Sequence, residues 1–475
     1  MILRKDLIKI TDYLWEIPKD FRSDMCVPAR IYVDEKLLGK IFEDRSLEQL
    51  VNVATLPGLV NWALAMPDMH EGYGFPIGGV AGISAENGVI SPGGVGYDIN
   101  CGVRVLRSEL TLEEIKPYLE KLMNQIQRDV PSGVGRGGLF RLDQESLKNV
   151  LEQGAKYLIS RGHGEAEDVE HCEEKGNMFG AQAEAVSEKA KSRGRGQLGT
   201  LGSGNHFLEV QRVDEIFDEA TAQAFGLFKG QITMMIHSGS RGLGHQVCAD
   251  YVSIMHRALS KYGIQLPDSE LACAPFNSAE GQNYYSAMAA SANFAWANRQ
   301  MMTQLVRQAW QRILGPKNEL KLIYDVAHNI AKIENHNGAR LCIHRKGATR
   351  AFAPGNKELP EAYQQTGQPV LIPGTMGTVS YILAGAAGAA QTFFSVCHGA
   401  GRLLSRHAAL RVVQGSELKK QLEELGIVVR SLSLKGLAEE APLAYKDINN
   451  VVEVVAKAGL AKKVARLKPL GVVKG

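Results

Sequence analysis

Two hydrophobic periodicities succeed one another irregularly along the chain and predict a mixture of strands and helices. Short apolar runs rich in β-branched residues and bounded by Gly, Pro or Asn predict strands. They are GVISPG, CGVRVLRSEL, NHFLEVQRV, QITMMIHSG, LKLIYDVAHN, RLCIHRKG and GIVVRSLSL. Ser46 and Thr111 begin the capping-box sequences SLEQ and TLEE, each followed by apolar residues at helical spacing. Residues 278–314 predict one long or broken helix.

The order of these elements indicates the fold class. Strands and helices do not alternate strictly enough for a doubly wound sheet or a barrel, so we expect an α+β fold. No repeat of fixed period and no Pro- or Ser-rich linker divides the chain. We therefore predict a single large mixed domain over residues 1–475. Its helical, charged stretch 133–196 is expected to be an insertion or lobe.

The composition is that of a globular protein, with 475 residues of which 45% are hydrophobic and 22% charged. Seven scattered cysteines without C-x-x-C spacing indicate neither a disulfide framework nor a zinc ribbon, which favours a reducing compartment. The charged N-terminal sequence lacks the apolar core of a signal peptide, so we expect a cytoplasmic protein. A net charge of +3 decides little about nucleic acids, because their binding depends on clustered charge.

One segment raises the question of a membrane, because no Asp, Glu, Lys or Arg occurs between Glu361 and Arg402. Gln, Thr, Ser, Pro and repeated Gly interrupt any run of the ~20 apolar residues that a bilayer helix needs. We therefore expect this segment in the protein interior, and no contact with a membrane.

Candidate metal ligands lie near the ends of predicted strands. His206, His237, His328 and His398 all have Gly, Ser or Asn neighbours, and GVGYDINCG adds Asp98 and Cys101. Five of these six form a plausible ligand set: Asp98, Cys101, His206, His237 and His328. A thiolate can bridge two divalent ions, and imidazole and carboxylate complete their shells. Two ions ~3.5–4 Å apart suit phosphoryl chemistry. The alternative is a closed zinc site with four ligands.

Glycine-dense loops accompany these residues, namely PGGVGYDINCG, LGTLGSGNH, HSGSRGLGH, PGTMGT and CHGAGR. Each alone is typical of a tight turn that needs positive φ. Together they indicate a site where main-chain amides hold phosphates, with Arg241 and Arg402 as bidentate partners. The sequence contains no G-x-x-x-x-G-K-[ST] loop.

His398 has no evident ligand role if the other five residues fill the metal shell. Its neutral nitrogen, flanked by GAGR, could attack an α-phosphate and form a phosphoramidate. Such a nucleophile needs a group that orients the ring, and Asp68 of PDMHEG is the candidate. The residues alone leave two alternatives open for His398, a sixth metal ligand or a structural residue.

Six sequences, DINCGVR, GSGNHFLE, HSGSRGLGHQ, DVAHN, CHGAGR and the terminal GVVKG, together resemble the RtcB family. Its members are GTP- and manganese-dependent RNA ligases that join an RNA 3′-phosphate or 2′,3′-cyclic phosphate to a 5′-hydroxyl in tRNA splicing or RNA repair. The resemblance runs from about MPDMHEGYGFPIGG to the last residue. It implies a single α+β domain of the RtcB type, with glycine-rich loops around a central dinuclear metal site.

The resemblance also implies roles for individual residues. Two Mn²⁺ ions are held by Asp98, Cys101, His206, His237 and His328, with the cysteine as the bridge. His398 carries GMP, with Asp68 beside it. The implied GTP contacts are Asn205, Glu209, Thr375, Ser380, Gly399, Ala400, Gly401, Arg402, Tyr445 and Lys474. A thiolate with three imidazoles would by itself favour zinc or another softer ion.

The reaction that the resemblance implies has three nucleotidyl steps. His398 takes GMP from GTP with release of pyrophosphate, and the RNA 3′-phosphate then takes GMP from the histidine. The 5′-hydroxyl finally attacks the activated phosphate and displaces GMP. A cyclic phosphate end is first opened to a 3′-phosphate. The implied partners are tRNA halves or broken RNA, and archease for some members.

Two basic runs are candidates for contact with the RNA backbone, KAKSRGRGQ at 189–197 and IHRKGATR at 343–350. The first is equally typical of a solvated helix end followed by a loop. The stretch 133–196 resembles the longer form of the family and is expected to form part of an RNA-facing lobe. Two competing functions are a dinuclear phosphoesterase, which would not need His398, and a non-enzymatic RNA-binding factor, which would leave the ligand set without a role.

Overall fold

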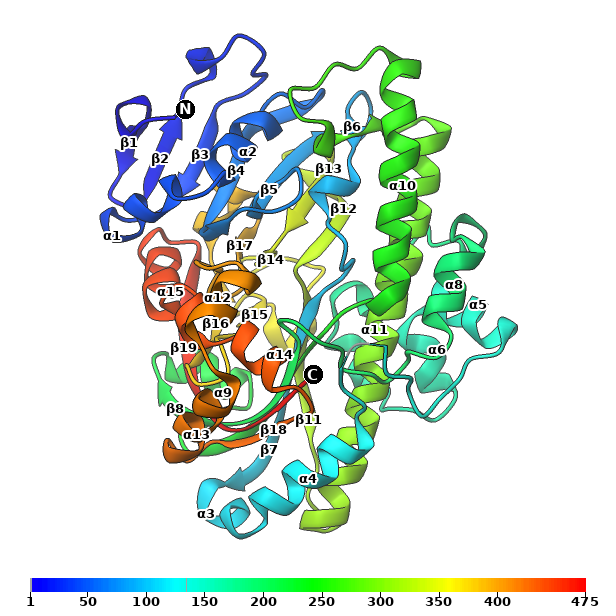
Figure 1. Cartoon of the computed structure of the whole chain (residues 1–475), viewed down its shortest axis with the longest axis vertical. Coiled ribbons are helices and arrows are strands. Elements are labelled where there is room, and N and C mark those ends of the chain that lie inside the picture. The colour runs from blue at the N-terminus through cyan, green and yellow to red at the C-terminus, as the bar shows by residue number, and fades with distance from the viewer. Residues whose placement is uncertain (1, 134) are drawn as a thin grey trace.

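Two large, mostly antiparallel sheets form the centre of the computed structural model, which describes residues 2–133 and 135–475 (Figure 1). The first sheet has the strand order β1 (Ile8–Thr11), β2 (Leu14–Ile17), β3 (Ala29–Tyr32), β4 (Leu59–His70), β5 (Ile77–Ser84), β13 (Ala339–Lys346) and β12 (Asn329–His336). The second has the order β11 (Lys321–Ala327), β7 (Gly102–Thr111), β9 (Gln231–Ser238), β8 (Phe207–Ile216), β19 (Ala461–Lys474), β16 (Ser380–Gly385) and β15 (Pro369–Ile372), with β18 (Val428–Ser431) parallel beside β19. Two small sheets pair β6 (Val89–Ile90) with β10 (Ala274–Pro275), and β14 (Ala348–Arg350) with β17 (Ser395–Cys397).

Two long helices, α10 (Arg241–Tyr262) and α11 (Ala279–Leu314), run side by side along one flank of the molecule (Figure 1). The Ser278 hydroxyl caps α11 by accepting the Gly281 N–H at 3.1 Å. Most of α11 is buried, including Trp296 and Trp310, because helices and strands pack around it. The remaining α-helices are α1 (Glu35–Leu38), α2 (Ser46–Val53), α3 (Leu112–Ile115), α4 (Leu119–Asp129), α5 (Gln144–Gln153), α6 (Ala155–Ser160), α7 (Glu167–Glu170), α8 (Glu188–Gly194), α9 (Glu219–Ala224), α12 (Arg406–Val412), α13 (Gly415–Glu424), α14 (Leu434–Glu439) and α15 (Ile448–Lys457).

The architecture confirms the predicted α+β class, and each of the seven predicted strand runs contains a strand. The predicted helix at 278–314 is a single helix of 36 residues. Within 133–196 the described residues form the short helices α5 to α8, which lie against α10 and α11 on the outer side of the molecule (Figure 1). The status of this stretch as an insertion stays a prediction.

The two predicted capping boxes differ in outcome. The Glu114 carboxylate accepts both the backbone N–H and the hydroxyl of Thr111 at 2.7 Å, so the box at Thr111 is confirmed. The prediction at Ser46 is wrong, because Ser46 is already the first residue of α2. The Asp44 carboxylate accepts the Ser46 N–H at 2.9 Å and so supplies the capping oxygen from two residues earlier.

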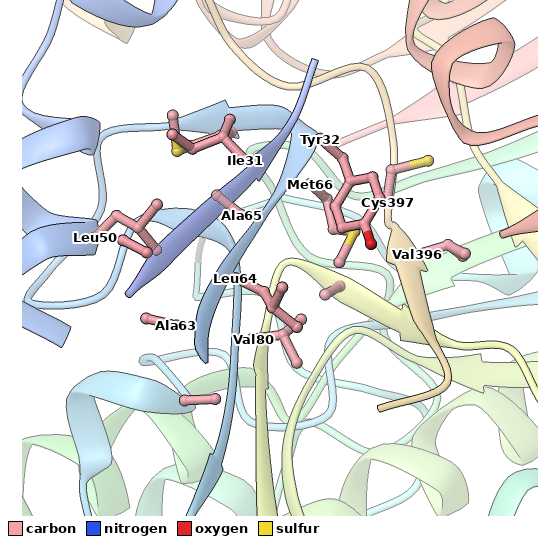
Figure 2. Close-up of a cluster of buried hydrophobic side chains, with 14 of the residues drawn as sticks. Ile31, Tyr32, Leu50, Ala63, Leu64, Ala65, Met66, Val80, Val396 and Cys397 are labelled. Atoms are coloured by element: carbon pink, nitrogen blue, oxygen red, sulfur yellow. The ribbon is translucent and has the colours of Figure 1, made fainter. Parts of the chain in front are cut away.

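The uncharged stretch between Glu361 and Arg402 forms β15, β16 and β17 and is largely buried, which confirms its predicted place in the interior. Val396 and Cys397 of β17 belong to the same apolar cluster as Tyr32 and Met66 of the first sheet (Figure 2). This packing fixes β17, and His398 follows directly after it. No helix among the described residues is long and apolar enough to cross a membrane.

Candidate active site

The second sheet brings the predicted metal ligands together at one end of its strands. Cys101 and His206 lie directly before β7 and β8, His237 lies near the end of β9, and His328 follows β11. Because β7 and β8 are both antiparallel to β9, and β7 is antiparallel to β11, these starts and ends lie side by side. His237 is the register partner of both Val103 and Phe207. Sheet pairing therefore explains why ligands far apart in the sequence converge.

Three of the ligand groups are within reach of a single ion. The donor atoms of Asp98, Cys101 and His206 all lie within 4.8 Å of one another. Nε2 of His206 is 2.8 Å from Asp98 Oδ2 and 3.6 Å from Cys101 Sγ, and Nε2 of His237 is 3.2 Å from the same sulfur. Ligands at about 2.0–2.3 Å from one metal ion have separations of this size. The donors present therefore fit a transition-metal ion.

The imidazole rings of the set are held in orientations that leave ring nitrogens free. Nδ1 of His328 is 2.9 Å from the Thr349 hydroxyl, and its Nε2 is buried with no partner among the described residues. Nδ1 of His206 is 3.1 Å from the Leu201 carbonyl. Histidine ligands usually bind such a group through the nitrogen that does not face the metal. Burial lowers the pKa of both His237 and His328 well below the ordinary value, so each ring is neutral and keeps a lone pair.

A cation would have to ionise the thiol of the set. Burial and the Asp98 carboxylate raise the pKa of Cys101 well above its ordinary value, so the thiol keeps its proton in the absence of a bound cation. A bound metal displaces that proton, since only the thiolate is a ligand. The structure places all five predicted ligands together, while the identity and number of the ions stay predictions.

A buried ion-pair network holds the turn that carries Asp98 and Cys101. Arg299 of α11 donates to the carbonyl oxygens of Asn100 at 2.8 Å and Ser238 at 2.9 Å, and it also binds the Asp325 carboxylate at 2.7 and 2.9 Å. Asn100 has φ +51°, a conformation that most residues avoid and that these contacts support. Arg299 and Asp325 were not among the residues predicted from the sequence. Their charge within an apolar helix and within the strand run LKLIYDVAHN was the available clue.

Asp68 on β4 of the first sheet meets the predicted nucleophile. Its Oδ2 lies 2.5 Å from Nδ1 of His398 and accepts the backbone N–H groups of His398 at 2.9 Å and Gly399 at 3.3 Å. Burial raises the pKa of Asp68, but His398 and Lys446 outweigh it, and the pKa lies below the ordinary value. The ionised carboxylate holds the ring proton on Nδ1 and leaves Nε2 as a free lone pair. This geometry is the one predicted for an oriented nucleophile.

Close approach requires glycine at two positions around these groups. Gly401 has φ +72°, and a Cβ there would lie 2.1 Å from the Asp68 carbonyl oxygen. A Cβ at Gly239 would lie 2.3 Å from Asp98 Oδ1. Any larger residue would displace Asp68, which contacts His398, or Asp98, which belongs to the candidate metal site.

A cavity of about 420 Å³ adjoins both the metal ligands and His398. All five glycine-rich loops contribute to its lining, for example through Gly96, Asn205, His245, Thr375 and Ala400. Of the predicted nucleotide contacts, those that line it are Asn205, Thr375, Gly399, Ala400, Gly401, Arg402, Tyr445 and Lys474. Lys474 reaches it because the end of β19 pairs with the start of β8 at Phe207. The volume is in the range of small-molecule and cofactor sites.

Two predicted nucleotide contacts, Glu209 and Ser380, lie behind the cavity wall. The Gln211 amide donates to the Glu209 carboxylate at 2.7 Å and to the Ser380 hydroxyl at 3.2 Å. Burial raises the pKa of Glu209 to about 8, and its Oε1 has no partner among the described residues. A ligand that reached this depth would find a buried carboxyl oxygen that has no hydrogen-bond partner among the described residues.

The two arginines that were expected to bind phosphate, Arg241 and Arg402, contact other residues of the protein instead. Arg402 lines the cavity, but its guanidinium donates to Leu404 O, Glu439 O, the Glu440 carboxylate and the Tyr445 hydroxyl. It also lies 4.8 Å from the centroid of the Tyr445 ring. Arg241 lies 3.1 Å from Nδ1 of His206 and does not line the cavity. Four of the five N–H groups of Arg402 are therefore engaged within the protein, and Arg241 supports His206 from outside the cavity lining. Glu440 is buried beside Arg402 and was not among the residues predicted from the sequence.

The predicted RNA contact at 343–350 stays a prediction: the run is largely buried in β13 and β14, and of its basic residues only Lys346 lines the cavity. Its basic residues bind groups inside the fold: Arg345 pairs with Glu334 at 2.5 Å, Arg350 pairs with Glu174 at 2.9 Å, and Lys346 donates to the carbonyl oxygens of Tyr73 and Phe75. In the other run, 189–197, Lys189 and Arg193 are exposed, and contact of this run with RNA stays a prediction.

The fold and the site together define a mixed α/β protein with a thiol, imidazole and carboxylate ligand group beside a carboxylate-bound histidine. Comparison with known proteins shows to which family a protein of this class belongs. The family described as tRNA-splicing ligase RtcB matches residues 49–475. The tRNA-splicing ligases RtcB of Archaeoglobus fulgidus and Thermococcus kodakarensis are each 55% identical over 477 residues, covering 99% of this chain and 99% of theirs. The RNA-splicing ligase RtcB of Mycobacterium tuberculosis is 53% identical over 90% of this chain and 100% of its own. The chain belongs to the RtcB family, as its motifs predicted.

Proposed function

We propose that the protein is a GTP-dependent RNA ligase that joins RNA 3′-phosphate or 2′,3′-cyclic phosphate ends to 5′-hydroxyl ends. Family membership supports the ligase activity, since the relatives are named as tRNA-splicing or RNA-splicing ligases. The observation that carries the chemistry is the contact of Asp68 Oδ2 with Nδ1 of His398 at 2.5 Å. The ring of His398 lies 5.5 Å from that of His328, so the nucleophile adjoins the ligand group.

The first step that we propose is transfer of GMP to His398. Nε2 attacks the α-phosphate of GTP, an N–P bond forms, and the bond between the α-phosphorus and its bridging oxygen breaks to release pyrophosphate. The ring becomes positively charged, and the Asp68 carboxylate on Nδ1 stabilises this charge. A dinuclear phosphoesterase whose nucleophile is a metal-activated water does not need a histidine held in this way, and for that reason we favour the ligase.

The remaining steps transfer GMP onward. An oxygen of the RNA 3′-phosphate attacks the phosphorus on His398, the N–P bond breaks, and a phosphoanhydride forms between RNA and GMP. The 5′-hydroxyl then attacks the 3′-phosphate and loses its proton, a phosphodiester forms, and GMP leaves. A 2′,3′-cyclic phosphate is hydrolysed to the 3′-phosphate beforehand. Each step exchanges one phosphorus bond for another, so no second energy source is needed.

The thiol, imidazole and carboxylate donors of the ligand group fit a divalent transition-metal ion, and we propose that this ion is Mn²⁺. Asp98, Cys101, His206, His237 and His328 would hold two Mn²⁺ ions, with the Cys101 thiolate between them. When bound, the ions supply positive charge to phosphate oxygens. For the nucleotide we propose the cavity wall formed by Asn205, Thr375, Gly399 to Arg402, Tyr445 and Lys474, with Glu209 and Ser380 behind it. Burial lowers the pKa of Lys474 to about 8.

The same proposal covers the RNA substrates, the residues that contact them, the protein partner and the cellular compartment. We propose tRNA halves or broken RNA as substrates, with 189–197 and the lobe 133–196 contacting the RNA backbone, and archease as an activating partner. All seven cysteines are free thiols, which suits the reducing cytoplasm.

A labelling experiment tests the proposed function. The protein is incubated with α-labelled GTP and Mn²⁺, denatured, and treated with acid or alkali. We expect an acid-labile, alkali-stable adduct that His398→Ala abolishes and that His407→Ala, a change at an exposed histidine of α12, retains. If no adduct forms while cyclic phosphate ends are still opened, the protein is a phosphoesterase and the ligase proposal fails.

A further inference from the structure

Three rings that the proposed chemistry does not use line the same cavity. Tyr73, Tyr97 and His245 come from the loop between β4 and β5, the turn before β7 and the first turn of α10. The centroids of Tyr73 and Tyr97 are 5.5 Å apart with the rings at 68°, and those of Tyr97 and His245 are 4.7 Å apart at 31°. The rings therefore form a continuous aromatic surface at the cavity wall.

These rings are open to a ligand. Tyr73 and Tyr97 are partly exposed and His245 is exposed. Within residues 2–133 and 135–475, neither tyrosine hydroxyl forms a hydrogen bond that would fix its ring in place. Partly exposed aromatic rings in contact with one another at a cavity mouth are suited to bind a flat apolar face.

The backbone beneath Tyr73 is fixed before any ligand binds. Lys346 donates to the Tyr73 carbonyl at 2.5 Å, the Gly72 N–H donates to the Gln49 side chain at 3.0 Å, and the Gly74 N–H donates to the Glu270 carboxylate at 2.8 Å. Tyr97 is similarly held, because the next residue, Asp98, accepts from the Asn329 amide through its carbonyl oxygen at 3.1 Å. A preset surface of this kind loses little conformational entropy on binding.

Positive charge lies beside the rings. Arg193 of α8 is exposed and donates to the Gln246 side chain at 3.0 Å, and Gln246 is the neighbour of His245 on α10. Aromatic faces next to basic side chains are the pattern of single-stranded nucleic-acid sites, where bases stack and phosphates are bound electrostatically. The charge thus favours a nucleobase over another flat ligand.

We infer that Tyr73, Tyr97 and His245 form a stacking platform for a nucleobase of the RNA strand next to the end being joined. The inference rests on the proposed function and extends it to the RNA. Tyr97 directly precedes the ligand Asp98, so a base on the platform has its phosphate beside the metal site. Every base has a π-face, so the platform holds RNA ends without reading their sequence.

Binding of short RNA tests the platform. Two fluorescein-labelled single-stranded hexanucleotides serve as probes, one with a 3′-phosphate and one with a 5′-hydroxyl at the unlabelled end, and anisotropy at fixed salt gives Kd. We expect His245→Leu and Tyr97→Leu to weaken binding of at least one RNA about fivefold or more, the low end of the range for one base stack. His245→Phe and Tyr97→Phe should restore binding to within about twofold, because they keep an aromatic face.

Matched controls separate stacking from structure. Tyr118→Leu removes a tyrosine that is 44% exposed and outside the cavity lining, and should bind both RNAs like the unchanged protein. An abasic terminal nucleotide should weaken binding to the unchanged protein and abolish its advantage over His245→Leu. Equal affinity of the Leu variants and the unchanged protein for both RNAs would overturn the inference. Absence of GMP labelling and of ligation in the unchanged protein would instead overturn the proposed function.

Discussion

Replacement of Asp68 by Asn is the sharpest test of the proposed nucleophile. Oδ2 faces three N–H groups, from the His398 ring, the His398 backbone and Gly399, while Oδ1 is buried without a partner. The asparagine oxygen must therefore take the place of Oδ2, since an NH₂ group there would face three donors. The ring keeps its proton on Nδ1, and the main change is the loss of the negative charge.

The contacts of Asp68 set the expected changes in the rate of GMP transfer and in the free energy of unfolding. A hydrogen bond to a charged acceptor contributes about 1.5–3 kcal/mol and one to a neutral acceptor about 0.5–1.5 kcal/mol. Loss of the carboxylate charge, about 1–1.5 kcal/mol in the positively charged state of His398, should therefore slow GMP transfer about 5- to 15-fold. The asparagine NH₂ group takes the unpartnered place of Oδ1, which should lower the free energy of unfolding by about 1–3 kcal/mol. Asp68→Ala leaves two backbone N–H groups without an acceptor and should destabilise the fold more.

Single-turnover labelling with α-labelled GTP measures the rate, and urea unfolding measures the stability. Asp214→Asn is the control, because Asp214 binds Arg466 at 2.7 Å away from the cavity. A rate for Asp68→Asn equal to that of the unchanged protein would refute the role of Asp68. A fall in rate of the same size in Asp214→Asn would show that the effect is not specific to the site.

Three further predictions follow from the ligand group and the buried ion pairs. Cys101→Ser should lower the manganese bound per chain after dialysis, measured by plasma mass spectrometry, because a hydroxyl rarely ionises to bridge two ions; undiminished metal would contradict the bridge. Arg299→Met leaves Asp325 with Arg104 as its remaining ion-pair partner and should lower the free energy of unfolding in urea by about 3–5 kcal/mol; a loss below about 1 kcal/mol would contradict the importance of this network. Burial raises the pKa of Glu334, but Arg345 and His336 outweigh it, and the folded-state pKa lies below the ordinary 4.5. Its stabilisation is therefore present above pH 4.5 and lost as the pH falls through the folded-state pKa, so Glu334→Gln should lower Tm at pH 7 and the difference should shrink in acid; a difference independent of pH would argue against this pair.

Local sequence was enough for the strands and for much of the site. The strand runs are apolar and β-branched, and the ligands stand where those runs meet glycine, so both could be predicted from neighbours in the sequence. The prediction that Ser46 caps α2 was wrong because Asp44 and Ser46 are both residue types that favour the start of a helix. The choice between them depends on the path of the chain before that helix.

Long-range pairing explains the other differences. The run 343–350 has the charge of an exposed nucleic-acid contact, and only the fold shows that Glu334 and Glu174 neutralise its arginines in the interior. Arg299 and Asp325 are linked in the same way, as are Arg402 and Glu440. A charge run in a sequence carries no information on burial, because its partner lies on another element.

The proposed nucleophile His398 follows β17 of a small sheet and is held by Asp68 on β4 of the first sheet. The proposed ligands Cys101, His206 and His328 lie at the strand ends of the second sheet. The proposed reaction therefore requires that the two sheets remain docked, and a local opening between them should stop this reaction before either sheet unfolds. A molecule can bind across the cavity only while the two sheets are docked. By thermodynamic linkage it then stabilises the docked state by RT ln(1 + [L]/Kd), where [L] is its free concentration and Kd its dissociation constant. A bound substrate would then stabilise the contact between the two sheets as well as take part in the reaction.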